Sequence, residues 1–171
     1  MNSSDIEFKS IISDIINNET VLKMKNFKQH FDCDCYQHCY DVAYYCYKIT
    51  KKLKLDYVSA TRAAMLHDFF LYDWHFKSDR RGLHAYTHGK CACMNALKLF
   101  PLNEKEQNMI KCHMWPVTFV PPKSIEGFIL TFVDKYCASK EILYHVFKNL
   151  IMKPSFRNAL IFLHIIVINI K

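Results

Sequence analysis

The sequence has little glycine and proline, with three glycines and five prolines among 171 residues. Folds made of many short strands need these residues at their turns, so their scarcity argues against such a fold. Leucine, isoleucine, lysine, alanine and methionine are common instead, and they favour long helices. A hydrophobic fraction of 51% and an aromatic fraction of 15% suffice for one core. We therefore expect a globular, all-α, single-domain protein.

The sequence also lacks an export signal at its start. The first ten residues, MNSSDIEFKS, are polar and contain no apolar stretch of the kind that signal peptides carry. Without export, the eight cysteines are expected to remain reduced thiols. This pattern predicts a cytoplasmic protein.

Long hydrophobic runs are missing as well. The most apolar stretch, ALIFLHIIVINI at residues 159–170, is 12 residues long, whereas a spanning helix needs about 20. We expect no transmembrane segment. The stretch is interpreted as a final core helix or as the contact of a homodimer, with a membrane-surface segment as the alternative.

A dense basic block is the last absent feature. Lysine and arginine exceed aspartate and glutamate by 23 − 16 = +7, but they form neither a stripe nor a nucleic-acid-binding motif. We expect no nucleic-acid partner. The net charge suits a small phosphorylated ligand, and it equally suits ordinary surface lysines.

Apolar periodicity and capping residues predict a series of helices. One stripe, which runs from His38 through Val42, Tyr45, Ile49 and Leu53, marks the second helix. The expected helices cover residues 5–24, 38–53, 56–70, 86–99, 103–114 with Asn103 and Glu106 at its start, and 125–150 with a break near residue 140. Residues 72–85 and 115–124 are expected to be loops, and no strand is expected. Residues 1–35 would form an N-terminal helix and lead-in, 36–140 the core, and 141–171 C-terminal helices of the same domain.

Several imidazoles and carboxylates interrupt apolar segments, where an ionised group needs a partner. Each of them alone is commonly a hydrogen-bonded core residue. Together they favour a metal site, because they come from different predicted helices that can converge at the centre of a bundle. Small residues near them, such as Ala60 and Ala63 before His67, leave room for an ion. The set consists of His38, His67, Asp68, His88, His113 and Asp134.

The order of these residues resembles the H…HD…D signature of the HD-domain metal-dependent phosphohydrolases. The supporting segments are HCYDVAYYCYKI around the first histidine, RAAMLHD at the HD pair (His67 and Asp68), and the final aspartate, Asp134. His88 and His113 fall where the dinuclear branch of the family carries two further histidines, and the six-residue pattern is similar to that of bacterial members that hydrolyse nucleotides or dinucleotides. The resemblance covers roughly residues 36–140.

The resemblance implies a compact HD-domain helical bundle with two divalent transition metals. It implies that Asp68 bridges the two ions as the catalytic residue, with His38, His67 and Asp134 on one ion and His88 and His113 on the other. Two cations can clamp phosphate oxygens and lower the pKa of an attacking water, so that no protein nucleophile is needed. Iron or manganese is favoured, and zinc, cobalt, nickel or magnesium also fits.

The function implied is hydrolysis of a phosphoester or phosphoanhydride bond in a small nucleotide-like substrate by a metal-activated water. The alternative is a non-catalytic HD-like module that binds a nucleotide or a protein. The candidate substrate contacts are His84, Arg80, Arg81 and Lys135. Arginine forks suit phosphate oxygens, although these four residues also fit a solvated surface, and His84 could replace His88 as a ligand.

Cysteine pairs offer a weaker metal signal. They are Cys33 and Cys35 with Cys39, and Cys91 and Cys93 with Cys112. One residue separates the members of each pair, whereas zinc ligand pairs are separated by two to four residues. Core packing is the favoured interpretation of these cysteines.

Overall fold

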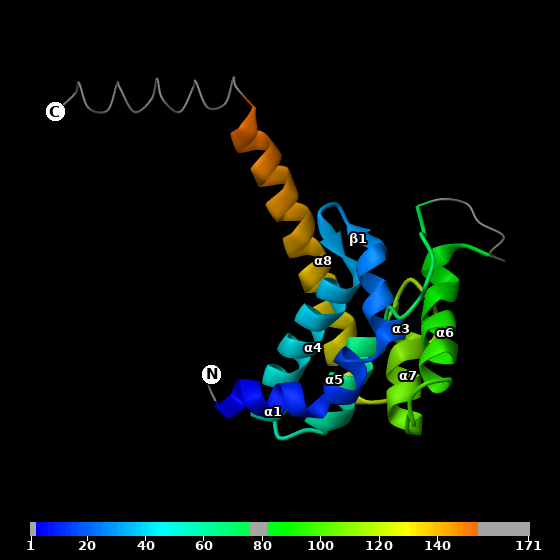
Figure 1. The fold of residues 1–171 in the computed structure, drawn as a ribbon. Helices are drawn as coiled ribbons and strands as arrows, with labels where there is room; N and C mark the ends of the chain where they lie inside the picture. Colours follow the sequence, from blue (N-terminus) through cyan, green and yellow to red (C-terminus); the bar gives the residue numbers. More distant parts are fainter. Residues whose placement is uncertain (1–2, 76–81, 154–171) are drawn as a thin grey trace.

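The computed structural model describes residues 3–75 and 82–153, and helices dominate them (Figure 1). Within these residues lie eight α-helices, one 3-10 helix and a two-stranded hairpin. The all-α, single-domain prediction is confirmed. Arg80 and Arg81 and the apolar stretch 159–170 lie outside the described residues.

The N-terminal segment is broken into short pieces, so the prediction of one helix over residues 5–24 is wrong. It forms α1 (Ser3–Ile11), α2 (Ser13–Ile16), α3 (Glu19–Leu22) and the 3-10 helix η1 (Lys23–Asn26). Asn18 caps α3, because its side-chain oxygen accepts hydrogen bonds from the backbone N–H groups of Thr20 and Val21. Asparagine competes with helix continuation in this way.

A small hairpin that was not predicted follows, with β1 (Lys28–His30) antiparallel to β2 (Cys33–Asp34). Its strands are too short for an alternating pattern to stand out in the sequence. Phe31, with a positive φ of 49°, lies in the turn between the strands. The hairpin buries the side chain of Gln29 against the HD pair.

The centre of the molecule consists of α4 (Cys35–Lys52), α5 (Tyr57–Leu66) and α8 (Ile125–Met152), with α4 packed on the other two (Figure 1). The buried face of α4 includes His38 and Val42, as predicted. Ile49 and Leu53 are exposed, however, and Tyr45 is half-buried. Small residues such as cysteine and alanine line the buried face instead, and they allow the helices to approach closely.

Helix α5 ends at Leu66, earlier than the predicted end near residue 70. His67 is its C-cap, and the backbone N–H of Phe69 bonds to the carbonyl of Leu66. The chain therefore leaves the helix at the HD pair. Phe69 and Phe70 are fully buried in the core, and the Asp68 side chain is buried as well.

Helices α6 (His84–Leu97) and α7 (Glu104–Cys112) cover one side of this centre. α6 begins two residues before the predicted start. α7 begins with the predicted capping box, in which Asn103 and Glu106 exchange hydrogen bonds with each other's backbone. The two helices touch at Gly89, where a Cβ atom would lie 2.9 Å from the carbonyl oxygen of Ile110.

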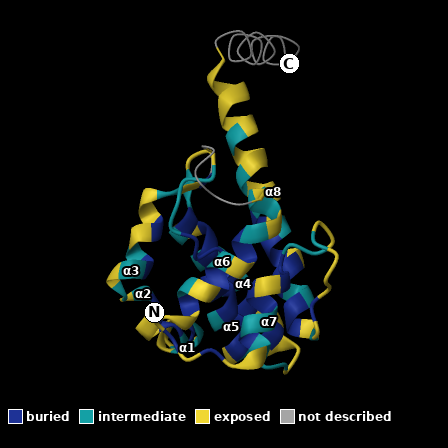
Figure 2. Cartoon of the chain, turned by 90° about the vertical axis from the view of Figure 1, so that its right-hand side faces the viewer, coloured by how far each residue is buried: buried dark blue, intermediate teal, exposed yellow. Residues whose placement is uncertain are grey.

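Helix α8 is continuous over 28 residues, so the predicted break near residue 140 is wrong. The Ser139 hydroxyl donates to the Lys135 carbonyl within the helix and leaves the helical backbone intact. The first half of α8 is packed in the core, whereas the second half projects beyond it and is largely exposed (Figure 2). Among the described residues, no helix has both the length and the apolarity needed to cross a membrane.

Candidate metal centre

The structure brings all six predicted residues together in the interior. His38 comes from α4, the HD pair from the end of α5, and Asp134 from α8. The other two come from α6 and the end of α7. Their donor atoms form three overlapping groups, each with all atoms within 4.8 Å of one another: His38, His67 and Asp68; His67, His113 and Asp134; and Asp68, His88 and His113.

Asp68 lies between two halves of the cluster. Its Oδ1 atom is 3.2 Å from His88 Nε2 and 3.5 Å from His113 Nε2, and its Oδ2 atom is 3.4 Å from His67 Nε2. On the far side, Asp134 Oδ1 lies 3.1 Å from His38 Nε2 and 3.5 Å from His67 Nε2. The Asp68 carboxylate therefore faces both sets of histidines.

All four rings are held through their Nδ1 atoms. Nδ1 of His67 lies 2.7 Å from the Ala64 carbonyl oxygen, and Nδ1 of His113 lies 2.8 Å from that of Ile110. Both carbonyls belong to the last turn of a helix, where no backbone N–H is available to them. His88 Nδ1 is likewise 2.7 Å from the carbonyl oxygen of His84.

The fourth ring, His38, uses a carboxylate instead. Its Nδ1 lies 2.9 Å from Glu141 Oε1. A carbonyl or carboxylate oxygen can only accept, so Nδ1 carries the proton in each of these rings. In the neutral form of each ring, Nε2 then carries a lone pair, and all four Nε2 atoms point into the cluster.

This arrangement leaves polar atoms that need a cation. Nε2 of His88 lies 2.8 Å from Nε2 of His113, so a proton or a metal ion must separate the two lone pairs. His67 Nε2 and Asp68 Oδ1 are buried without a hydrogen-bond partner, at a typical cost of about 1–3 kcal/mol each. Imidazole nitrogens with carboxylate oxygens form a donor set that suits a transition metal, and the cluster fits one.

Protons balance the charges of the metal-free cluster. Burial disfavours the charged form of His38, but the hydrogen bonds that its ring donates to Asp134 and Glu141 outweigh it and raise the pKa well above 6.5. Burial likewise opposes the charge of His67, and the negative charge of Asp68 raises its pKa well above 6.5. Each of these two rings therefore takes up a second proton more readily than a free imidazole does.

The other two histidines, His88 and His113, differ from each other in the direction of their pKa shifts. Burial, and next the repulsion from His88, lower the pKa of His113 to about 3. For His88, burial opposes the charge but Asp68 raises the pKa, so the proton of this pair belongs to His88. Burial raises the pKa of Asp68 and of Asp134, yet the facing histidines lower both below 3.8. Both carboxylates are ionised.

Two contacts of the cluster were not predicted. Gln29 of the hairpin donates through Nε2 to Asp68 Oδ2 at 2.5 Å, and Glu141 holds His38. Glu141 lies seven residues, or two helical turns, after Asp134, and this spacing could have placed it on the same face of α8. No comparable signal pointed to Gln29, because the hairpin itself was not predicted.

A cavity of about 300 Å³ opens onto the cluster and is lined by Asp68, Trp74, His84 and Lys135, among others. The Lys135 ammonium donates to the carbonyls of His113 and Thr131, and burial lowers its pKa. Lys135 is thus half-buried at the opening of the cavity.

His84 also lies at this opening but outside the three groups of donor atoms. Its ring stacks on His88 with centroids 4.4 Å apart, and its Nδ1 lies 3.1 Å from the Tyr72 hydroxyl oxygen. The ring that reaches the cluster is therefore that of His88. A ligand role for His84 has no support in this geometry.

None of the three donor groups contains a cysteine. All eight cysteines are free thiols. Burial raises the pKa of Cys39 and of Cys46 well above 9.0, so both remain protonated and pack as small core residues.

The described residues thus place four imidazoles and two carboxylates where they could hold a metal ion. Their role as metal ligands stays a prediction. The chain was compared with protein-family models, with curated proteins and with solved structures, and none of them matched.

Proposed function

We propose that this protein is a metal-dependent phosphohydrolase of the HD-domain type. Its reaction would be the cleavage of a phosphoester or phosphoanhydride bond in a small, nucleotide-like substrate. One observation carries the proposal: four buried rings have Nδ1 bound to an oxygen and Nε2 turned toward two ionised carboxylates. Histidines that bind metals in proteins are commonly fixed in this way.

Each side chain of the cluster has a role in this proposal. With metal bound, His38, His67 and Asp134 would hold one ion and His88 and His113 a second, and Asp68 would contribute to both. The ions would be divalent metals, with iron or manganese favoured by the family resemblance and zinc, cobalt, nickel or magnesium as alternatives. When bound, such a pair supplies positive charge to phosphate oxygens and lowers the pKa of a water.

The size of the cavity favours a small substrate. Its volume of about 300 Å³ suits a compact phosphorylated molecule. Lys135 is fixed by two carbonyls and presents positive charge at the opening, and His84 stands beside it as a second polar contact. Arg80 and Arg81 are proposed to contact the phosphate as well.

We also propose a cytoplasmic location, because the eight free thiols suit a reducing compartment.

Replacing Asp68 with alanine tests this function. Because Asp68 faces both sets of histidines, Asp68→Ala should lose bound metal and phosphate release together. The measurements are elemental analysis of the purified protein and phosphate release from a panel of nucleotides with added manganese or iron. Asp41→Ala is the control, since Asp41 lies on α4 near His38 but outside the donor groups, and it should retain both properties.

The outcomes separate three possibilities. Equal phosphate release by Asp68→Ala and wild type would refute the proposal. Metal that binds to wild type without hydrolysis of any nucleotide would favour the non-catalytic binding module. Absence of metal and of metal-dependent activity in wild type would make the HD pair a structural polar contact.

A further inference from the structure

The second half of α8 has one covered side and one uncovered side. The hairpin covers the first: the Phe31 ring stacks on His145 with centroids 4.0 Å apart, and Lys148 donates to Asp32 at 2.9 Å. On the uncovered side, the helix extends past α4 into solvent (Figures 1 and 2).

The uncovered side is largely apolar, with Lys140 as a charged residue on it. We call it the α8 stripe: Tyr136, Leu143, Tyr144, Phe147, Leu150 and Ile151. These positions recur at intervals of three, four and seven residues, which places them along one side of the helix. All but Leu150 expose between 52% and 69% of their surface. Such spacing is typical of a helix that packs along another helix.

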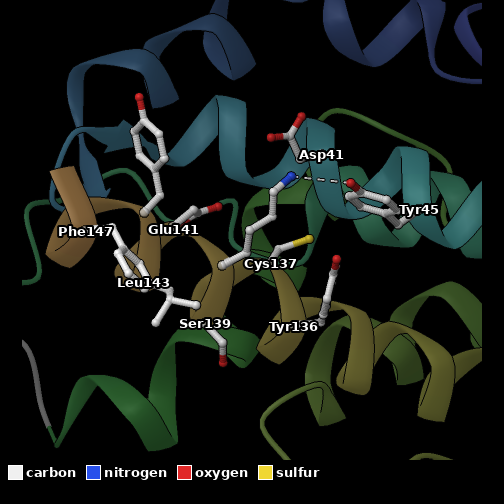
Figure 3. A pocket seen from close by; sticks show the side chains of 10 residues that line it. Asp41, Tyr45, Tyr136, Cys137, Ser139, Glu141, Leu143 and Phe147 are labelled. Carbon is white, nitrogen blue, oxygen red and sulfur yellow. Dashed lines mark hydrogen bonds between the residues drawn. The ribbon is translucent and has the colours of Figure 1, made fainter. Parts of the chain in front are cut away.

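A groove continues the stripe toward the body of the molecule. It has a volume of about 630 Å³ and lies between α4 and α8, with Tyr45, Tyr136, Leu143 and Phe147 in its wall (Figure 3). The Lys140 ammonium lies inside it, 3.4 Å from the Tyr45 hydroxyl. A groove of this volume has room for apolar side chains of a second helix.

We propose that the α8 stripe is the interface of a homodimer in which the α8 helices of two copies pack antiparallel. The two-fold axis passes between Leu143 and Tyr144, so Leu143 of each copy faces Tyr144 of the other. The tip of one helix, at Ile151, then lies against Tyr136 and the groove of the other. This inference is independent of the proposed function.

A second copy fits because one helix carries both complementary surfaces. A two-fold axis pairs the exposed tip with the groove twice, as an isologous interface requires. From Tyr136 to Ile151 the stripe is about 22 Å long at 1.5 Å per residue. Half-exposed side chains of this size offer about 100 Å² each, so six residues and the groove wall approach the roughly 800 Å² per partner of a stable interface.

Charge selects the register. With the axis between residues 143 and 144, Lys140 faces the Phe147 ring of the second copy, where an ammonium is attracted to the ring face. An axis through Tyr144 would instead place Lys140 opposite Lys148 of the second copy. Like charges across an interface are unfavourable.

Sedimentation velocity on the full chain tests the interface. Wild type should be a dimer at micromolar concentration, and Phe147→Lys should weaken the dimer about 30-fold or more, because it places an ammonium opposite Lys140 of the second copy. The matched control is Ile142→Lys, a comparably exposed position that points away from the stripe on the same helix, and it should remain dimeric.

A mixing experiment tests the register. Leu143→Glu alone and Tyr144→Lys alone should each be monomeric. An equimolar mixture should form a heterodimer, because the introduced carboxylate of one chain would face the introduced ammonium of the other. A monomeric wild type would overturn the proposal, including one in which residues 159–170 of the same chain cover the stripe. A dimer that survives Phe147→Lys, or a mixture that stays monomeric, would overturn it equally.

Discussion

At the scale of single residues, the tautomer of each histidine decides what the cluster can bind. Three Nδ1 protons go to backbone carbonyls, which mutation of a side chain cannot remove. The fourth goes to Glu141, whose second oxygen is buried without a hydrogen-bond partner. Glu141 is thus a positioning residue for His38 that can be tested directly.

Glu141→Ala should weaken metal binding about 10- to 100-fold, the usual effect of removing the partner of a metal-binding histidine. Without the carboxylate, the His38 ring is free to rotate, and its proton can lie on Nε2 instead of Nδ1. Glu141→Gln should lose less, because an amide oxygen still accepts from Nδ1. Titration with cobalt(II), followed by its visible absorption, measures the affinity.

Asp41→Ala serves as the control for this series, since Asp41 lies one turn after His38 and bonds to Gln37 instead. It should bind cobalt as wild type does. Equal affinities for wild type and Glu141→Ala would show that Glu141 does not position His38.

At the scale of helices, the spacing of α6 and α7 sets the distance between His88 and His113. Gly89 allows this approach: an added Cβ would lie 2.9 Å from the Ile110 oxygen and 3.4 Å from His113 Cε1. Gly89→Ala should therefore push α7 away from α6 and lower both the melting temperature and the number of metals bound per chain.

Asn103→Ala is the matched comparison. It removes the cap of α7, at a cost of about 1 kcal/mol, but leaves the contact at Gly89 intact. Its melting temperature should fall while its metal content stays that of wild type, as measured by thermal unfolding and elemental analysis. If Gly89→Ala keeps its full metal content, the approach of the two helices does not control the site.

Helix positions could be predicted where the sequence carries a strong local signal. The capping box at Asn103 and the apolar spacing of α8 are of this kind. Predictions failed where short-range polar groups compete with the helix, as Asn18 does in the N-terminal segment. On the buried side of α4 they held for His38 and Val42 but failed further along the helix, because the choice among Tyr45, Ile49 and the cysteines depends on neighbours in space.

The convergence of the six residues followed from their type and from their place in apolar runs. The parts that could not be predicted act through backbone geometry. They include the carbonyls that bind Nδ1, the end of α5 at the HD pair and the hairpin that brings Gln29 to Asp68. Such contacts depend on where helices end, and helix ends are only loosely encoded in a single sequence.

At the scale of the whole molecule, the core and the cluster contribute separately to stability. Met65, Leu66, Phe69 and Phe70 are fully buried around the HD pair, and their packing does not involve the carboxylate. In the metal-free protein, protons on His38 and His67 compensate the ionised aspartates. Removal of metal should therefore leave the helices folded, in contrast to small zinc domains that unfold without their ion.

Metal should nevertheless raise the melting temperature, and more so at higher pH. A ligand at 100 times its Kd stabilises a protein by about 2.7 kcal/mol. The pKa values of His38, His67 and His88 are raised in the metal-free fold. Protonation of these rings therefore stabilises the metal-free fold fully below pH 6.5, and this stabilisation is lost as the pH rises through the raised pKa values. Metal must displace these protons, so its affinity grows over the same window.

Thermal unfolding, followed by circular dichroism, is to be measured with manganese and with chelator at pH 6, 7 and 8. Helices should be present at every pH, and the difference in Tm between the manganese and chelator samples should widen as the pH rises. A gap that is constant or narrows toward pH 8 would mean that these histidines do not bind the metal.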